Sequence, residues 1–232
     1  MIRLLISVTD LKEARQATCA DLIDLKNPVQ GALGALPVKA IQAIRQALPG
    51  HKLSATVGDL PLVPKEVVRA ADEIAATGVD YVKIGLFEGD VQATLQALSP
   101  LARRTKLVGV ILADRPADFS VLEDLAHAGF TGAMLDTADK RRGSLTELRP
   151  LIWIQEFVKR ARELGLLAGL AGSLRLEDVP RLTPLKPDYL GFRSAACQGG
   201  QRTSRLDPQR LHQLHQAIRE PLPADPNVAV PA

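Results

Sequence analysis

The chain has 232 residues, of which 46% are hydrophobic and 24% are charged, and this composition excludes disorder for most of its length. Aromatic residues make up only 3% and the formal net charge is +3, which argues against a nucleic-acid binder, since such a protein needs stacking side chains or a concentrated basic face. No apolar stretch approaches membrane-spanning length, so we expect no membrane partner.

The cysteines and the first residues of the chain bear on its compartment. Cys19 and Cys197 lie in apolar or small-residue settings without a CxxC spacing, so we expect reduced thiols with no disulfide framework and no metal site. The first residues enter a strand directly, without the pattern of a signal peptide. These features predict a cytoplasmic protein, and the sequence leaves open whether it forms a homo-oligomer.

Short apolar runs bounded by turn residues recur along the chain, and each one predicts a buried strand. The expected strands are 3–8, 21–26, 53–57, 81–86, 107–113, 132–135, 166–170 and 189–192. Amphipathic stretches between them predict helices. The first is capped by Thr9 or Asp10 and runs through Ala17, and the others cover a segment from Pro37, a segment from Pro64, 90–98, 116–128, 150–164 and a segment from Asp207-Pro208.

Eight strands that alternate with helices over short loops predict an α/β protein with a single (β/α)8 TIM barrel over residues 1–220. A doubly wound sheet is the competing topology. It would normally carry one dominant Gly-rich phosphate loop after its first strand, and Val8-Thr9-Asp10 is not such a loop. The tail 221–232 holds four prolines in twelve residues and is predicted to be disordered.

Charged residues stand inside several strands or at their ends. Asp24 and Lys26 lie on one face of the second strand, and Asn27-Pro28 ends that strand, so Lys26 sits at its C-terminal tip. Lys83 lies in the middle of the fourth strand and Asp136 at the tip of the sixth. Burying such groups is costly unless they are paired or used. Together they predict an active site at the carboxyl end of the barrel.

A weak internal repeat places these residues on common levels. In its register Asp24 and Lys83 share one level, while Lys26, Asp136 and Arg193 share a level one inward step higher. All five have the same strand parity, so all should point to the same side of the sheet. The segments that superpose in this way are 19–26, 78–85, 129–136 and 186–193.

The lysines admit a structural and a catalytic explanation. Lys83 could simply be paired with an acid, Lys26 could be exposed in a loop, and Lys140 lies in a stretch, 139–143, that also fits a solvated loop. In a dry site near other cations, however, a lysine loses part of its proton affinity. The neutral amine can then form a Schiff base with an aldehyde or ketone while a second lysine moves protons, and Lys140 could supply further positive charge.

The last two strands end in sequences that suit a phosphate. Their following loops are the usual phosphate-binding loops of this barrel, and backbone N–H groups beside a helix N-terminus favour a dianion. Three arginines in this region could add bidentate contacts. We therefore expect a small-molecule phosphate as substrate, bound by Gly172, Ser173, Gly191, Arg193, Ser194, Arg202 and Arg205.

Over residues 2–219 the chain resembles one known family through a specific series of motifs. In order these are IDLKNP (23–28), GALGA (31–35), SATVGD (54–59), YVKIGL (81–86), LDTA (135–138) followed by Lys140, LAGSL (170–174) and GFRSAAC (191–197). The family is (5-formylfuran-3-yl)methyl phosphate synthase, also called 4-(hydroxymethyl)-2-furancarboxaldehyde-phosphate synthase. The loop 199–202 and the prolines of the tail depart from its pattern.

The resemblance implies a lyase that condenses two glyceraldehyde 3-phosphate molecules, with loss of phosphate and water, into the furan precursor of methanofuran-type cofactors of one-carbon metabolism. It also implies Lys26 as the Schiff-base lysine and Lys83 as the proton acceptor, assisted by Asp24, Asp136 and Lys140. No cofactor is expected. No metal is expected either, because the histidines fall on predicted helices or loops away from the strand tips.

Two alternatives remain open at this point. A generic Schiff-base aldolase acting on sugar phosphates would share the lysine chemistry, and only product analysis would separate the two enzymes. A catalytically silent phosphate-binding barrel would bind ligand without turnover and without covalent trapping. The paired lysines and aspartates argue against the silent barrel, since a binding protein needs no desolvated amine.

Overall fold

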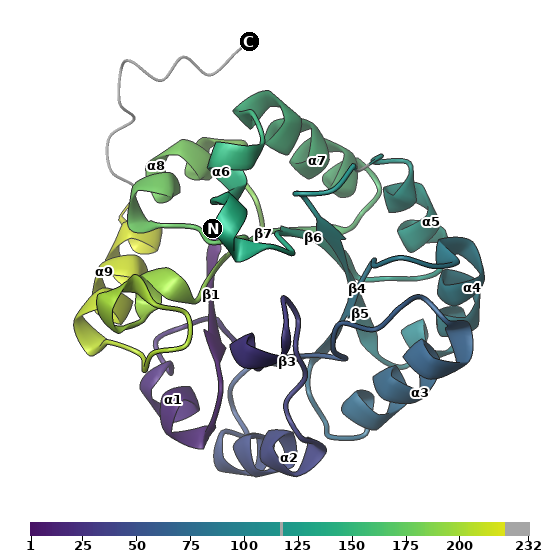
Figure 1. The fold of residues 1–232 in the computed structure, drawn as a ribbon, viewed down its shortest axis with the longest axis horizontal. Coiled ribbons are helices and arrows are strands. Elements are labelled where there is room, and N and C mark those ends of the chain that lie inside the picture. Colours follow the sequence, from purple (N-terminus) through teal and green to yellow (C-terminus); the bar gives the residue numbers. More distant parts are fainter. Residues whose placement is uncertain (117, 221–232) are drawn as a thin grey trace.

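The computed structural model describes residues 1–116 and 118–220 and shows a closed barrel of parallel strands surrounded by helices (Figure 1). Consecutive strands pair with each other, and β8 (Tyr189–Phe192) closes the ring by pairing with β1 (Arg3–Val8). This is the predicted (β/α)8 barrel, and it excludes the doubly wound sheet, which is open. The tail 221–232, for which the sequence predicts disorder, lies outside the described residues.

All the predicted strands are present, and their ends differ from the prediction by no more than one residue. Parallel strands that are covered by helices are buried on both faces, so each appears in the sequence as a short apolar run between turn residues. The remaining strands are β2 (Leu22–Leu25), β3 (Leu53–Thr56), β4 (Tyr81–Gly85), β5 (Lys106–Leu112), β6 (Gly132–Asp136) and β7 (Leu167–Leu170).

The helices form the outer layer (Figure 1). They are α1 (Leu11–Gln16), α2 (Val38–Ala47), α3 (Pro64–Ala75), α4 (Val91–Ala102), α5 (Val121–His127), α6 (Leu145–Leu148), α7 (Leu151–Glu163), α8 (Val179–Leu182) and α9 (Pro208–Arg219). Asp10, Asp90 and Asp207 cap α1, α4 and α9 by accepting backbone N–H bonds, and Asp207 is followed by a proline that opens α9. Among the described residues, no helix combines the length and apolar character needed to cross a membrane.

The helical prediction differs from the structure at four helices. Helix α4 continues to Ala102 rather than ending near Leu98, and α5 begins at Val121 rather than near Pro116. The short helices α6 and α8 were not predicted. Four residues make barely one turn, which is too short for an apolar periodicity to appear.

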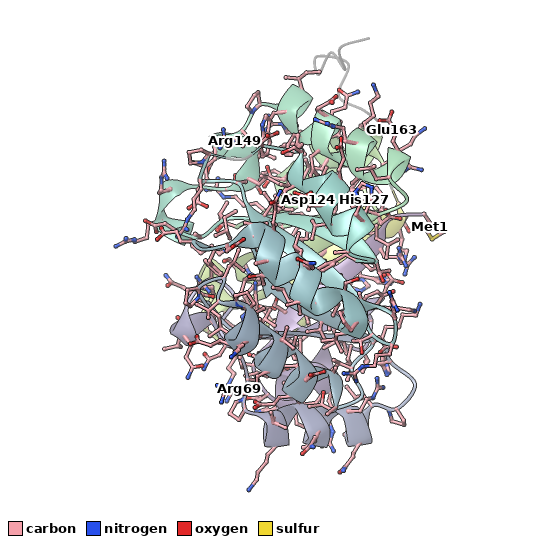
Figure 2. All side chains as sticks on the ribbon, turned by 90° about the vertical axis from the view of Figure 1, so that its right-hand side faces the viewer. Met1, Arg69, Asp124, His127, Arg149 and Glu163 are labelled. Atoms are coloured by element: carbon pink, nitrogen blue, oxygen red, sulfur yellow. The ribbon has the colours of Figure 1, made fainter. Side chains whose placement is uncertain are left out.

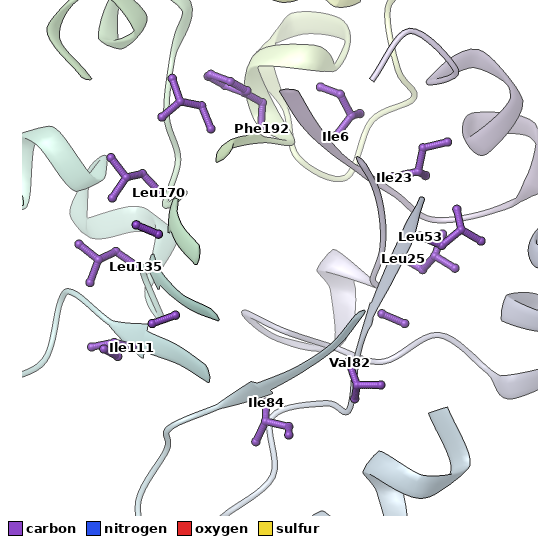
Figure 3. Packing of buried hydrophobic residues seen from close by; sticks show 14 of the residues in the cluster. Ile6, Ile23, Leu25, Leu53, Val82, Ile84, Ile111, Leu135, Leu170 and Phe192 are labelled. Atoms are coloured by element: carbon purple, nitrogen blue, oxygen red, sulfur yellow. The ribbon is translucent and has the colours of Figure 1, made fainter. Parts of the chain in front are cut away.

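Two separate apolar layers hold the barrel together. Outward-facing strand residues such as Ile6, Ile23 and Val82 form the large core between the strands and the helices, and Figure 3 shows them on the outer side of the ribbon. Fully burying one such side chain stabilises the fold by about 1.5–3 kcal/mol. Charged side chains such as Arg69 and Glu163 lie instead on the exposed surface (Figure 2). A smaller apolar cluster lies inside the barrel and leaves room there for the charged residues.

Candidate active site

A pocket at the carboxyl end of the barrel strands, here called the barrel pocket, contains every predicted site residue except Arg205. The strand alternation explains its polar lining, because residues next to the outward-facing core residues must point inward. Lys26, Lys83, Asp24 and Asp136 are all buried there.

Lys83 and Asp24 form the deeper pair of the barrel pocket. The Nζ of Lys83 lies 2.6 Å from Oδ1 of Asp24. Two hydroxyls from neighbouring strands also donate to the Asp24 carboxylate, Ser54 Oγ at 2.6 Å and Ser7 Oγ at 3.0 Å. Both serines stand opposite Asp24 in the strand register, so the sheet itself brings these groups together.

Burial and charge compete at this deeper pair. Burial alone would raise the pKa of Asp24, but the ammonium groups of Lys83 and Lys26 outweigh it, so the pKa of the carboxyl is lowered. Burial also lowers the pKa of Lys83, and the Asp24 carboxylate restores only part of it. Asp24 therefore stays ionised, while Lys83 gives up its proton more readily than an exposed lysine.

Lys26, Asp136 and Lys140 form the outer group of the barrel pocket. Lys26 Nζ lies 3.5 Å from Asp136 Oδ2, and Lys140 Nζ donates to Asp136 Oδ1 and, at 3.1 Å, to Thr137 Oγ1. Burial would raise the pKa of Asp136, but Lys140 and Lys26 hold it well below its usual range. Burial lowers the pKa of Lys140 to about 8, against the opposing effect of Asp136.

These pairings agree with the two levels predicted from the internal repeat, with one exception. Asp24 meets Lys83 on the deeper level, and Lys26 meets Asp136 on the outer one. Lys140, for which a solvated loop was the alternative, lies in the short 3-10 helix Lys140–Arg142 and reaches the same carboxylate. The site thus brings together three amines and two carboxylates from β2, β4, β6 and the loop after β6. The exception is Arg193.

Arg193 borders the barrel pocket but does not offer it a free guanidinium. Its N–H groups donate to the buried carboxylate of Glu13, at 2.6 and 3.3 Å, and to the carbonyl oxygens of Ser7, Arg202 and Ser204. All five donors are used inside the protein. A bidentate contact of Arg193 with a phosphate, as the sequence predicts, would therefore have to replace bonds to Glu13 or to these carbonyl oxygens.

The other two predicted arginines differ from each other. Arg205 is exposed, forms an ion pair with Asp10 and does not line the barrel pocket, so the structure does not bring it to the site. Arg202 does line the pocket, and one of its N–H groups donates to the carbonyl of Gly31 at 2.8 Å. Arg202 is therefore the predicted arginine that remains available to a phosphate.

The loop after β7 has an unusual backbone beside the pocket. Gly172 and Ser173 both have positive φ angles, 101° and 52°. Such a conformation is uncommon for serine, and strained residues cluster at ligand-binding sites. A Cβ on Gly172 would come within 2.9 Å of Thr137 Cγ2, so glycine is required there. Gly191 and Ser194 line the same wall from the β8 side.

The loop between β2 and α2 covers part of the barrel mouth. The Asp59 carboxylate accepts the backbone N–H groups of Ala32 and Leu33 at 2.8 and 2.6 Å, and a Cβ on Gly31 would collide with Asp59 at 2.2 Å. Leu33 is fully buried in the interior cluster. In the sequence, GALGA and SATVGD stand among the family motifs, but no role could be assigned to Asp59 or Glu13, because their partners are distant in the chain.

The family model described as 4-HFC-P synthase matches residues 4–215 of the chain. The chain belongs to this family. A (5-formylfuran-3-yl)methyl phosphate synthase of Methanocaldococcus jannaschii is 36% identical over 233 residues, which covers 93% of this chain and 99% of the relative. One of Methanopyrus kandleri is 39% identical over 216 residues, which covers 86% and 91%.

Solved structures of low sequence identity share the fold of this 4-HFC-P synthase family member. The 3-hexulose-6-phosphate synthase of Salmonella typhimurium superposes with a TM-score of 0.68 at 17% identity, covering 94% of this chain and 99% of its own. The 3-keto-L-gulonate-6-phosphate decarboxylase of Vibrio cholerae gives 0.66 at 17% identity, covering 94% and 98%. At these identities the likeness shows the barrel alone.

Proposed function

We propose that the protein condenses two molecules of glyceraldehyde 3-phosphate into (5-formylfuran-3-yl)methyl phosphate, with loss of phosphate and water, through a Schiff base on Lys26. The observation that carries the proposal is the convergence of Lys26, Lys83 and Lys140 on two aspartates in one buried pocket. The names of the relatives support the reaction, since they carry the same product.

Lys26 is the proposed nucleophile because of its place in the pocket. It stands at the tip of β2 with its amine 3.5 Å from Asp136, while Lys83 is held more tightly and deeper by Asp24 at 2.6 Å. An amine must be neutral to add to the aldehyde. The lowered pKa of Lys140 makes it a suitable acceptor for the proton that Lys26 gives up through the shared carboxylate.

The product retains one of the two phosphates, so the other must leave as inorganic phosphate. In the imine on Lys26 the proton on C2 of the triose is acidified, and Lys83, with its lowered pKa, is the proposed base. Loss of that proton makes the phosphate on C3 a leaving group. The resulting conjugated iminium can accept, at its C3, C2 of the second triose once that carbon has lost its own proton. The C2 oxygen of the first triose then closes the ring on the aldehyde carbon of the second, and loss of two waters with hydrolysis of the imine gives the furan and frees Lys26.

The test is covalent trapping combined with product analysis. With glyceraldehyde 3-phosphate and borohydride, the wild type should lose activity and gain one adduct on the peptide that contains Lys26. Without borohydride it should release inorganic phosphate and form a furan chromophore. Lys26→Arg should abolish the adduct and turnover, since a guanidinium stays protonated. Lys106→Arg, an exposed lysine at the start of β5, is the matched control and should behave like the wild type.

Three results would change this proposal. An adduct on Lys83 instead of Lys26 would exchange the roles of the two lysines. Trapping without a furan would favour a generic sugar-phosphate aldolase. No adduct and no turnover in the wild type would leave a phosphate-binding barrel.

A further inference from the structure

A second hollow adjoins the barrel pocket on the side of β7 and β8. Both are lined by Lys140, Ser173, Ser194 and Arg202, so these four residues stand between the two spaces. The outer wall comes from the loops after β6, β7 and β8 and from the first turns of α9, which contribute Arg210 among others. We call this space the outer hollow.

The outer hollow is strongly basic. Arginine and lysine side chains dominate its charged lining, against the single carboxylate of Glu177, and the cations are Lys140, Arg141, Arg175, Arg202 and Arg210. Some of this charge is neutralised nearby, because Arg141 pairs with Asp139 and Arg175 pairs with Glu147 at 3.0 Å and with Glu177 at 4.0 Å. The remaining positive charge belongs mainly to Arg202 and Arg210.

Among the described residues, the guanidinium groups of Arg202 and Arg210 have N–H donors that make no hydrogen bond within the protein. Arg202 uses one N–H group, for the carbonyl of Gly31, and faces the shared wall between the two spaces. Within residues 1–116 and 118–220, the guanidinium of Arg210 has no side-chain hydrogen bond and no carboxylate within 4.0 Å. It stands only partly exposed in the first turn of α9. Planar guanidinium groups with free N–H pairs match the oxygens of a phosphate.

We propose that the outer hollow binds the phosphate of the second triose phosphate, with Arg202 and Arg210 as its charged partners. This rests on the proposed function, because a reaction between two phosphorylated molecules needs two anion sites open at the same time. The first molecule, on Lys26, directs its phosphate to Gly172–Ser173 and Ser194. The second enters through the outer hollow and extends its carbon chain past Lys140 and Ser173 toward the imine, so its phosphate is the one that the product keeps.

The decisive experiment uses two measurements that depend on different substrate molecules. Trapping with borohydride requires only the first molecule to bind, whereas furan formation requires both. In Arg210→Gln, trapping at Lys26 should stay within about twofold of the wild type. Furan formation at low substrate should fall about ten- to a hundredfold, as expected for a lost charge-assisted contact. Arg69→Gln, an exposed arginine on α3, is the control and should change neither.

Furan formation that is unchanged in Arg210→Gln would overturn the proposal, and so would a parallel loss of trapping, since Arg210 would then serve the first molecule. A second measurement tests the outer hollow without relying on the proposed reaction. Inorganic phosphate titrated into the wild type by calorimetry should occupy two sites, and Arg210→Gln should lose one of them. Equal stoichiometry in both proteins would refute the outer hollow even if the enzyme proved to catalyse another reaction.

Discussion

Asp136 binds two lysines at once and sets the charge balance of the barrel pocket. Its Oδ1 accepts from Lys140, and its Oδ2 lies 3.5 Å from the amine of Lys26. With Asp24 committed to Lys83, two carboxylates face three amines in this pocket. The excess positive charge favours an anionic ligand and loss of a proton from one of the amines.

Loss of a proton from Lys140 should make the activity depend on pH. Its pKa of about 8 means that it becomes neutral as the pH rises through 8, whereas an ordinary lysine would stay charged up to about 10.5. If it accepts the proton of Lys26, kcat/KM should rise with pH and level off above about 8. Lys140→Arg should remove this ascending limb, because the guanidinium does not deprotonate. The measurement is a kcat/KM profile between pH 6 and 10.

The same lowered pKa has a consequence for stability with a definite sign. Between about pH 8 and 10.5 the unfolded chain binds more protons at Lys140 than the folded protein does. The contribution of this group to the free energy of unfolding therefore increases with pH across that window.

The kinetic prediction has a clear contrary outcome. An ascending limb of kcat/KM that persists in Lys140→Arg would assign the titrating group to another residue, with Lys83 the next candidate.

At the scale of strands, much of the site follows from alternation. The period of two residues puts Asp24 and Lys26 on one face, and the layered interior of the barrel brings residues of alternate strands to common levels. Arg193, like Lys26, follows the last residue of its strand and borders the barrel pocket, but its guanidinium is bound by Glu13. Its partner Glu13 stands 180 positions earlier, and nothing local in the sequence indicates their pairing.

The pair of Arg193 and Glu13 predicts a loss of stability where the sequence alone predicted a loss of binding. Arg193→Ala leaves the fully buried carboxylate of Glu13 without its charged partner. Removing one member of a buried pair costs about 3–5 kcal/mol. The free energy of unfolding, measured by urea denaturation, should fall by this amount. Binding should weaken as well, because Arg193 also holds the carbonyls of Arg202 and Ser204.

Arg205→Ala is the matched control on the same loop. Its ion pair with Asp10 is exposed, so the free energy of unfolding should change by less than about 1 kcal/mol. Ser173→Ala should raise the Michaelis constant while the free energy of unfolding stays close to that of the wild type. Equal stability of Arg193→Ala and Arg205→Ala would show that the buried pair is not important for folding.

In the whole molecule, the outer apolar layer and the charged interior are largely independent. The fold could be predicted because the apolar pattern of the outer layer repeats around the barrel, from one strand and helix to the next. The outer hollow could not be predicted, because the three loops and α9 that line it are distant in the sequence and meet only when the barrel closes. Both interior carboxylates are also already paired. Asp24 and Asp136 already bind Lys83, Lys26 and Lys140, and a divalent ion would have to displace these amines.

This arrangement leads us to expect catalysis without a metal. Within the part of the chain that the structure describes, no group of three or more His, Cys, Asp or Glu residues is placed to hold an ion. The ammonium groups can stabilise developing negative charge on the substrate themselves. After exhaustive dialysis against EDTA, furan formation should therefore continue at the untreated rate. A matched sample supplied with Mg²⁺ or Zn²⁺ should be no faster, and a loss of activity that either ion restores would contradict a mechanism based on lysines alone.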